Sequence, residues 1–136
     1  MTFTNKLVVY FVSLAAFLLI DFIWLGWVAK NFYANQLGEL MAERINWTSA
    51  FIFYLLFVVG LLVFVILPAL EGGSLISAVY MGALFGVIAY ATYDLTNLAT
   101  LKNWPIMVTV VDLVWGGVLS ASVSIVGYYF GKLLFY

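Results

Sequence analysis

The sequence predicts an all-α integral membrane protein, a single domain over residues 1–136 in which four transmembrane helices form an antiparallel up-and-down bundle. Two observations exclude a soluble domain: 67% of the residues are hydrophobic and only 8% are charged, with a mean hydropathy of +1.18. Soluble chains are about 45–50% apolar and about 25% charged. A third observation gives the number of helices. Four stretches, residues 7–29, 48–70, 74–98 and 105–131, have the length of about 20 apolar residues that crosses a bilayer.

The first apolar stretch is predicted to be a retained span and not a signal peptide. Lys6 precedes it, as in a signal peptide, but no small-residue cleavage site follows and the run continues through Asp21 to two Trp residues. A transmembrane barrel is excluded because its strands alternate apolar and polar residues over about ten positions, whereas these stretches are apolar on all sides.

Short joints connect the later spans. Pro68 is predicted to end the second helix, and Gly72 and Gly73 let the chain reverse into the third. Before the fourth span, Asn103 suits a helix cap and Pro105 suits a first helical turn. Both joints are too short for anything but a hairpin of antiparallel helices.

The segment 30–47 is the one connection long enough for structure of its own. Apolar side chains recur there at four-residue spacing, opposite charged ones, which is the pattern of a short amphipathic helix at the membrane interface. An ordinary linker that touches the lipid headgroups fits equally well. The apolar positions are Tyr33, Leu37, Met41 and Ile45, with Leu40 beside them, and the charged ones are Glu39, Glu43 and Arg44.

Composition also limits the chemistry. A net charge of −1 provides no basic surface, so no nucleic-acid partner is expected. The absence of Cys and His removes disulfides, thiolate and imidazole metal sites, haem ligation and His-based triads. We expect no cofactor. The lipid bilayer is the expected partner, and a chain this small would usually need a homodimer to build a full transport pathway.

The orientation in the membrane is weakly determined. The side holding the loops carries Lys30, Arg44 and Lys102, whereas the side holding the termini carries Lys6, Lys132 and the free amine. The positive-inside rule slightly favours the loop side as cytoplasmic. Because the two counts are nearly equal, insertion in both orientations stays open.

Three charged residues lie inside predicted spans. An Asp near a helix centre costs about 2.5–3.5 kcal/mol, so Asp21, Asp94 and Asp112 need a compensating interaction. Asp21 is nine residues before Lys30, Asp94 eight before Lys102 and Asp112 eight after Trp104, all on one side of the membrane. At about 1.5 Å per residue, each carboxyl lies roughly 12 Å inside that boundary. The sequence therefore predicts a layer of three Asp residues at a common depth.

Helical spacing predicts that this layer faces the bundle interior. In the third and fourth spans the Asp shares a stripe with small residues that allow close helix approach, and in the first span Asp21 shares a face with two aromatic residues. The stripes are Phe17, Asp21 and Trp24; Gly82, Gly86, Tyr90, Asp94 and Asn97; and Asp112, Gly116, Ser120 and Ser124.

The charge of the layer could be relieved by protonation, by an external cation or by hydrogen bonds with some water. A metal, if any, would use Asp21, Asp94 and Asp112. A polar knot that only locks the helices together is the structural alternative. The residues predicted to bind a ligand or proton are Asp21, Asp94, Asn97, Asp112, Tyr90, Tyr93, Trp24 and Trp115.

The five Trp residues all fall in the half of the membrane that holds the Asp layer. Trp27, Trp47 and Trp104 lie at segment ends and are predicted to form an interfacial belt. Trp24 and Trp115 lie three residues from Asp21 and Asp112, deeper than a belt requires. They could line a cavity beside the carboxyls or simply pack.

Three motifs resemble those of a known protein family: IDFIWLG (20–26), YDLTNLATLKNWP (93–105) and VDLVWG (111–116). In them the sequence resembles a family of small bacterial integral membrane proteins defined as a domain of unknown function, over nearly the whole chain. The resemblance implies a multi-pass location in the bacterial inner (cytoplasmic) membrane. It marks Asp21, Asp94, Asn97, Asp112 and Trp115 as motif positions, and it implies no activity.

Three functions are consistent with the Asp layer. The first is binding or transport of a proton, a cation or a small polar ligand, because carboxyls inside a bundle are typical of such sites. The second is a structural or accessory membrane subunit, with the Asp layer holding helices together. The third is a membrane-embedded enzyme acting on a lipid or isoprenoid, with an Asp as general acid or base. No nucleophile with a recognisable neighbour supports catalysis, so the sequence leans against an enzyme.

Overall fold

The computed structural model describes all residues 1–136. Its regular secondary structure consists of helices, with no strand. Four continuous helical segments are long and apolar enough to span a membrane: Phe3–Val28, Trp47–Glu71, Leu75–Thr100 and Ile106–Phe135. All four predicted spans are therefore confirmed. The first begins four residues earlier than predicted because Thr2 caps it, accepting a hydrogen bond of 3.2 Å from the Asn5 backbone N–H.

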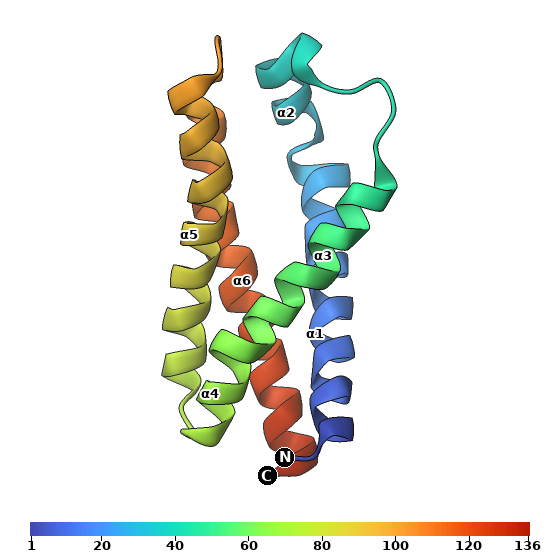
Figure 1. Ribbon diagram of the computed structural model, residues 1–136, viewed down its shortest axis with the longest axis vertical. Coiled ribbons are helices and arrows are strands. Elements are labelled where there is room, and N and C mark those ends of the chain that lie inside the picture. Colours follow the sequence, from blue (N-terminus) through green and yellow to red (C-terminus); the bar gives the residue numbers. More distant parts are fainter.

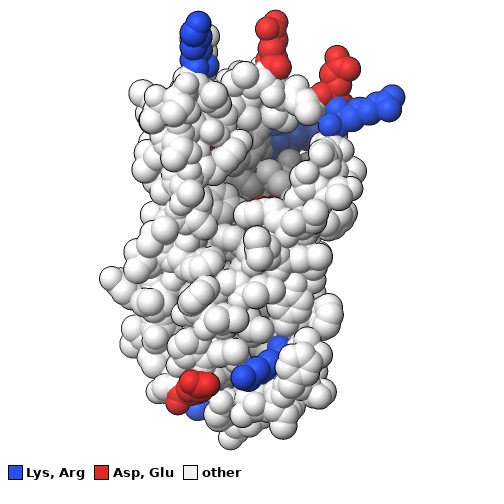
Figure 2. Space-filling model, viewed as in Figure 1, with Lys and Arg blue, Asp and Glu red and all other residues white.

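The helices lie along one long axis (Figure 1). The chain passes along α1 (Phe3–Ile23), through the short α2 (Lys30–Leu37), and back along α3 (Trp47–Leu61) and α4 (Leu67–Glu71). It then follows α5 (Leu75–Thr100) and α6 (Ile106–Phe135), and both termini lie at the end remote from α2. Charged side chains gather at the two ends of the molecule, and almost no charged atom shows between them in the view of Figure 2.

Two spans contain a π-helical turn. Trp24–Val28 (η1) continues α1, and Leu62–Ile66 (η3) joins α3 to α4. The second of these corrects a prediction: Pro68 does not end its helix, which continues to Glu71. Proline removes one backbone donor and crowds the preceding turn, and the wide π turn just before Pro68 accommodates both effects without a break.

The turns also differ in detail from the prediction. Asn103 is not the cap of α6; it adopts a left-handed backbone with φ of 60° in the turn, and Pro105 directly precedes the helix. Gly73, with φ of 63°, reverses the chain between α4 and α5 as expected. The Ser74 hydroxyl then caps α5 by accepting from the Ser77 backbone N–H at 3.1 Å.

The segment between the first two spans is helical only in its first part. α2 ends at Leu37. Gly38 follows it with a φ of 52°, a backbone conformation that favours glycine, and begins a 3₁₀ turn, Gly38–Leu40 (η2). Met41 and Ile45 therefore do not continue an amphipathic helix. The helix hypothesis holds for residues 30–37, and the linker hypothesis describes residues 41–46.

The closest helix contact is between α5 and α6. At Gly86 an added Cβ would lie 1.9 Å from the Gly116 carbonyl oxygen, and at Gly116 it would lie 2.6 Å from the Tyr90 ring. The two backbones can approach this closely only because both positions lack a side chain. This contact places Asp94 and Tyr90 of α5 beside Asp112 of α6.

Candidate functional site

A cavity of about 670 Å³ opens at the α2 end of the bundle, and the hollow is visible in the upper half of Figure 2. Eighteen residues line it, of which 14 are hydrophobic, and they come from every span and from the 30–47 segment. A mostly apolar cavity with a few polar groups is the usual form of a small-molecule site. Its aromatic members are Trp24, Tyr33, Phe53, Tyr54, Tyr90, Tyr93, Trp104 and Trp115.

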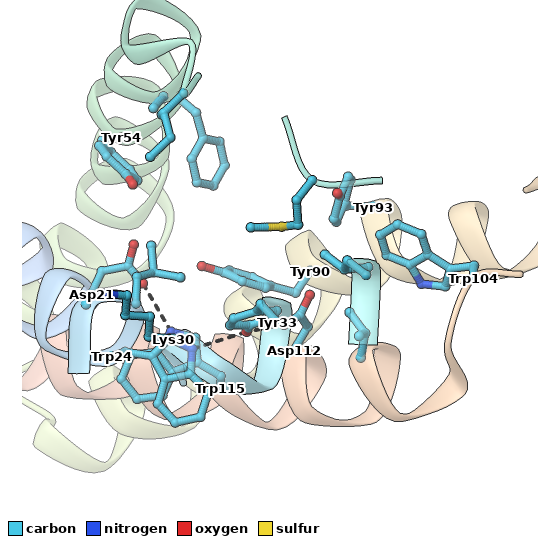
Figure 3. Close-up of a pocket in the computed structure, with 18 residues that line it drawn as sticks. Asp21, Trp24, Lys30, Tyr33, Tyr54, Tyr90, Tyr93, Trp104, Asp112 and Trp115 are labelled. Carbon is cyan, nitrogen blue, oxygen red and sulfur yellow. Dashed lines mark hydrogen bonds between the residues drawn. The ribbon is translucent and has the colours of Figure 1, made fainter. Parts of the chain in front are cut away.

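Two stacked indoles form one wall of the cavity. Trp24 of η1 and Trp115 of α6 lie with ring centroids 4.3 Å apart and planes 9° from parallel. Trp115 donates its Nε1–H to Asp21 Oδ1 of α1 at 3.2 Å, a bond drawn in Figure 3. Tyr54 and Tyr90 turn their hydroxyls towards the same carboxyl (Figure 3). Asp21 is only 4% exposed, and its hydrogen-bond donor is the neutral Trp115 indole.

The second indole begins a chain of hydrogen bonds that leads through Tyr33 of α2 to Asp112 of α6. Trp24 donates its Nε1–H to the Tyr33 hydroxyl at 3.1 Å, and Tyr33 donates to Asp112 Oδ1 at 2.5 Å. The stacked pair thus connects to two carboxyls, Asp21 through Trp115 and Asp112 through Trp24 and Tyr33. The helical segment α2 is tied to α6 by the same chain.

We expect the Trp115→Phe substitution to destabilise the protein by about 1–3 kcal/mol, because Phe retains ring stacking but leaves the buried Asp21 oxygen without its donor. Chemical denaturation in detergent would measure the loss. Trp27→Phe is the matched control, since Trp27 is 82% exposed. Equal stability of the two variants would show that the bond to Asp21 contributes nothing.

The third carboxyl, Asp94, lies behind the cavity wall. It is completely buried, and neither of its oxygens has a hydrogen-bond partner among the protein groups. Asp112 is the neighbouring carboxyl with which it interacts. Two ionised carboxylates side by side repel each other, so this buried pair favours a state in which one of them carries a proton.

A polar contact fixes the backbone at Asp94. Thr109 donates its hydroxyl to the Asp94 carbonyl oxygen at 3.3 Å, and the Trp104 indole donates to Thr109 at 3.1 Å. The bond from Thr109 joins the end of α5 to the start of α6. The side chain of Asp94 is therefore held beside Asp112 although its own oxygens are unpaired.

Residues 6–129 match the model of a family described as a predicted membrane protein, DUF2177. The chain belongs to this family. No curated protein and no solved structure matches it. All the residues that line the cavity, and Asp94 behind them, fall in the part that DUF2177 covers.

The DUF2177 fold brings most of the predicted site residues together. Those that line the cavity are Asp21, Trp24, Tyr90, Tyr93, Asp112 and Trp115. Asp94 adjoins Asp112 from behind. Asn97 does not line the cavity and lies instead beside Tyr93. No group of three acidic residues is close enough to hold a metal ion, so Asp21, Asp94 and Asp112 do not form a shared ligand set.

Sequence reasoning missed four cavity residues whose side chains can hydrogen-bond: Lys30, Tyr33, Tyr54 and Trp104. Tyr33 is the most important because it binds Asp112 directly. Its one signal was the apolar stripe of the 30–47 segment, and Tyr33, Leu37, Met41 and Ile45 of that stripe all line the cavity. Trp104 is a correction: it is 9% exposed and bonded to Thr109, whereas Trp27 and Trp47 are exposed at 82% and 50%.

Tyr33 lies outside the spans and acts as a neutral donor. Burial raises the pKa of its hydroxyl above the ordinary value of about 10, and the hydrogen bond to Asp112 raises this pKa further. The folded state therefore holds this proton more tightly than the unfolded chain does. The bond to Asp112 is present at neutral pH and is lost only when strongly alkaline pH removes the proton.

Proposed function

We propose that this membrane protein binds a monovalent organic cation in the cavity between Asp21 and Asp112. The observation that carries the proposal is the pairing of two buried carboxyls with a wall of aromatic rings. Each carboxyl accepts from a neutral aromatic donor, which orients it but adds no positive charge. Aromatic faces attract cations, and this attraction strengthens where water is scarce.

Charge balance favours a single positive charge on the ligand. The cavity lining contains two acidic residues, Asp21 and Asp112, and one basic residue, the exposed Lys30. With both carboxyls ionised, this leaves one negative charge, which one cation neutralises. An anionic ligand would meet the two carboxyls directly and is disfavoured.

The position of Asp94 favours a bound proton whose release is coupled to cation binding at this site. An ionised carboxylate with no partner in a buried position would be very unfavourable, so we assign Asp94 a proton. The other titratable groups near it are Tyr33 on α2 and Tyr93 on α5. A cation bound at the neighbouring Asp112 would stabilise the ionised form of Asp94 and therefore favour release of this proton.

The structural alternative, a polar knot between helices, is supported by the bond from Trp115 to Asp21, which joins α6 to α1. It accounts less well for Asp94, because a carboxyl that serves only to join helices should have its oxygens satisfied. It also leaves the cavity without a role. We therefore favour ligand binding.

Benzyltrimethylammonium, a small aromatic cation, tests the proposal. We expect it to bind saturably to the detergent-purified protein and to change the fluorescence of Trp24 and Trp115. Benzyl alcohol and benzenesulfonate are the neutral and anionic controls and should not saturate. Equal responses to all three compounds, or no response to any, would overturn the proposal and favour the structural alternative.

We expect Asp94→Asn to abolish proton release on cation binding while leaving the binding itself in place. Asn preserves the shape of Asp94 but has no carboxyl proton to lose. A pH dye in weakly buffered solution measures the release as benzyltrimethylammonium is added. Glu43→Gln, which neutralises an exposed residue outside the cavity, is the control. Release that continues in Asp94→Asn would contradict the assignment of this proton.

We extend the proposal from binding to transport: a homodimer in the bacterial inner membrane carries the cation across the bilayer. This extension rests on the four spans, on the buried carboxyls and on the small size of the chain. A flux assay in liposomes, with wild type and Asp112→Asn compared, distinguishes transport from binding alone.

A further inference from the structure

Two smaller hollows extend the cavity along the membrane-spanning part of the bundle. One, of about 380 Å³, is lined by Phe53, Ala89, Tyr90, Tyr93 and Asp112, all but Ala89 shared with the main cavity. The other, of about 350 Å³, is lined by α3, η3 and α5 and shares Phe53 with both. Because Phe53 borders both, we describe them together as one groove that begins at Asp112 and leads away from the α2 end. We call it the α3/α5 groove.

The groove results from the way in which α3 crosses the bundle. In Figure 1 α3 runs diagonally and diverges from α5 towards the α2 end, whereas η3 and α4 pack against α5. The residues along the opening face the lipid: Phe53, Leu56 and Phe64 are exposed at 44%, 68% and 66%. The groove is therefore open sideways to the bilayer.

The chemistry of the groove changes along its length. Asp112 is the only charged residue in the first hollow, and the second has none, being lined by six hydrophobic residues and Gly60. A ligand that occupied both parts would place a cationic group against Asp112 and a hydrocarbon chain between α3 and α5. This arrangement complements a molecule with one charged end and one apolar end.

We infer that the ligand is a single-chain cationic amphiphile, an alkylammonium, which enters from the bilayer through the α3/α5 groove. The inference rests on the proposed cation site and adds the tail and the lateral route to it. A phospholipid fits less well, because its phosphate would follow the headgroup into hollows that contain no basic residue to pair with it.

Decyltrimethylammonium provides the test, with benzyltrimethylammonium as the ligand that lacks a long tail. Protein in lipid nanodiscs would be titrated with each. The variant Ala89→Leu fills the first hollow without changing any charge. Ala99→Leu, on the same helix but outside the hollows, is the matched control. Partitioning of the probe into lipid is the same for all variants, so the comparison isolates the groove.

We expect Ala89→Leu to weaken decyltrimethylammonium binding by about tenfold and to leave benzyltrimethylammonium binding unchanged, with Ala99→Leu like wild type for both. Retained binding of the short cation also shows that the variant is folded. Unchanged decyltrimethylammonium binding in Ala89→Leu would overturn the inference that the groove binds the tail, while the proposed cation site would stand. If Ala89→Leu lost the binding of both cations, the tail would have no site separate from that of the ammonium group, and the inference would be overturned.

Two further outcomes separate the inference from the proposed function. Decyl sulfate is the anionic control. If it bound wild type as tightly as decyltrimethylammonium, and if Ala89→Leu weakened its binding equally, the requirement for a cationic head would be overturned. Wild type that binds neither ammonium compound would overturn the proposed function and the inference together.

Discussion

We expect Asp112→Asn to weaken the binding of benzyltrimethylammonium by roughly 30-fold or more. Truncating one partner of a buried, hydrogen-bonded charge pair costs about 2–5 kcal/mol, and each 1.4 kcal/mol is a factor of ten in the dissociation constant. Asn preserves the size of the side chain, and its amide oxygen can still accept from Tyr33. The loss would therefore report the missing charge and not a collapsed site. Titration of tryptophan fluorescence measures it.

The control for Asp112→Asn is Glu43→Gln, which removes one negative charge from the exposed segment between the first two spans. A small effect there, against a large one at Asp112, would show that the cavity charge matters and not the net charge of the protein. An affinity in Asp112→Asn within twofold of wild type would contradict the role of this carboxyl.

The second large effect is expected from Gly86→Ala, which should destabilise the protein by about 1–3 kcal/mol or more. The added Cβ would lie 1.9 Å from the Gly116 carbonyl oxygen and 2.3 Å from the Ser120 hydroxyl oxygen. A backbone carbonyl cannot rotate away as a flexible side chain could, so α5 and α6 must separate. Because this contact holds Asp94 beside Asp112, cation binding should weaken as well. Denaturation and titration in detergent measure the two losses.

Gly26→Ala is the matched control for Gly86→Ala, since a Cβ at Gly26 would have no atom within 4 Å. Its stability should lie close to that of wild type. A Gly86→Ala protein as stable as Gly26→Ala would mean that the two helices can repack at little cost, and the close α5 and α6 approach would then not determine the position of the carboxyls.

The helices and the depth of the Asp layer could be predicted because both depend on local properties of the chain. Hydrophobic length fixes a span, and the fixed rise of a helix converts residue spacing into depth. Asp21 and Asp112 consequently lie at the same cavity, as counting from the span ends predicted. The glycine stripes also indicated the correct faces, since Gly86 and Gly116 form the contact between α5 and α6.

The rest of the site depends on long-range contacts that no local pattern contains. Tyr33 reaches Asp112 across 79 positions of sequence, and its spacing alone indicated only an apolar face. Asn97 shares the helical stripe of Asp94 but lies nearer the end of α5, where its neighbour is Tyr93. The π turn before Pro68 was hidden because proline usually predicts the end of a helix.

The separation between the cavity and the chain ends provides a way to learn which compartment the cavity faces. Both termini lie at the end of the bundle remote from α2 (Figure 1), whereas the cavity opens beside α2 (Figure 2). A reporter fused to Phe135 or Tyr136 would leave the cavity entrance unobstructed. If that reporter is active in the cytoplasm, the entrance faces the other side of the membrane. A mixed signal would mean that the protein inserts both ways and offers binding sites to both compartments.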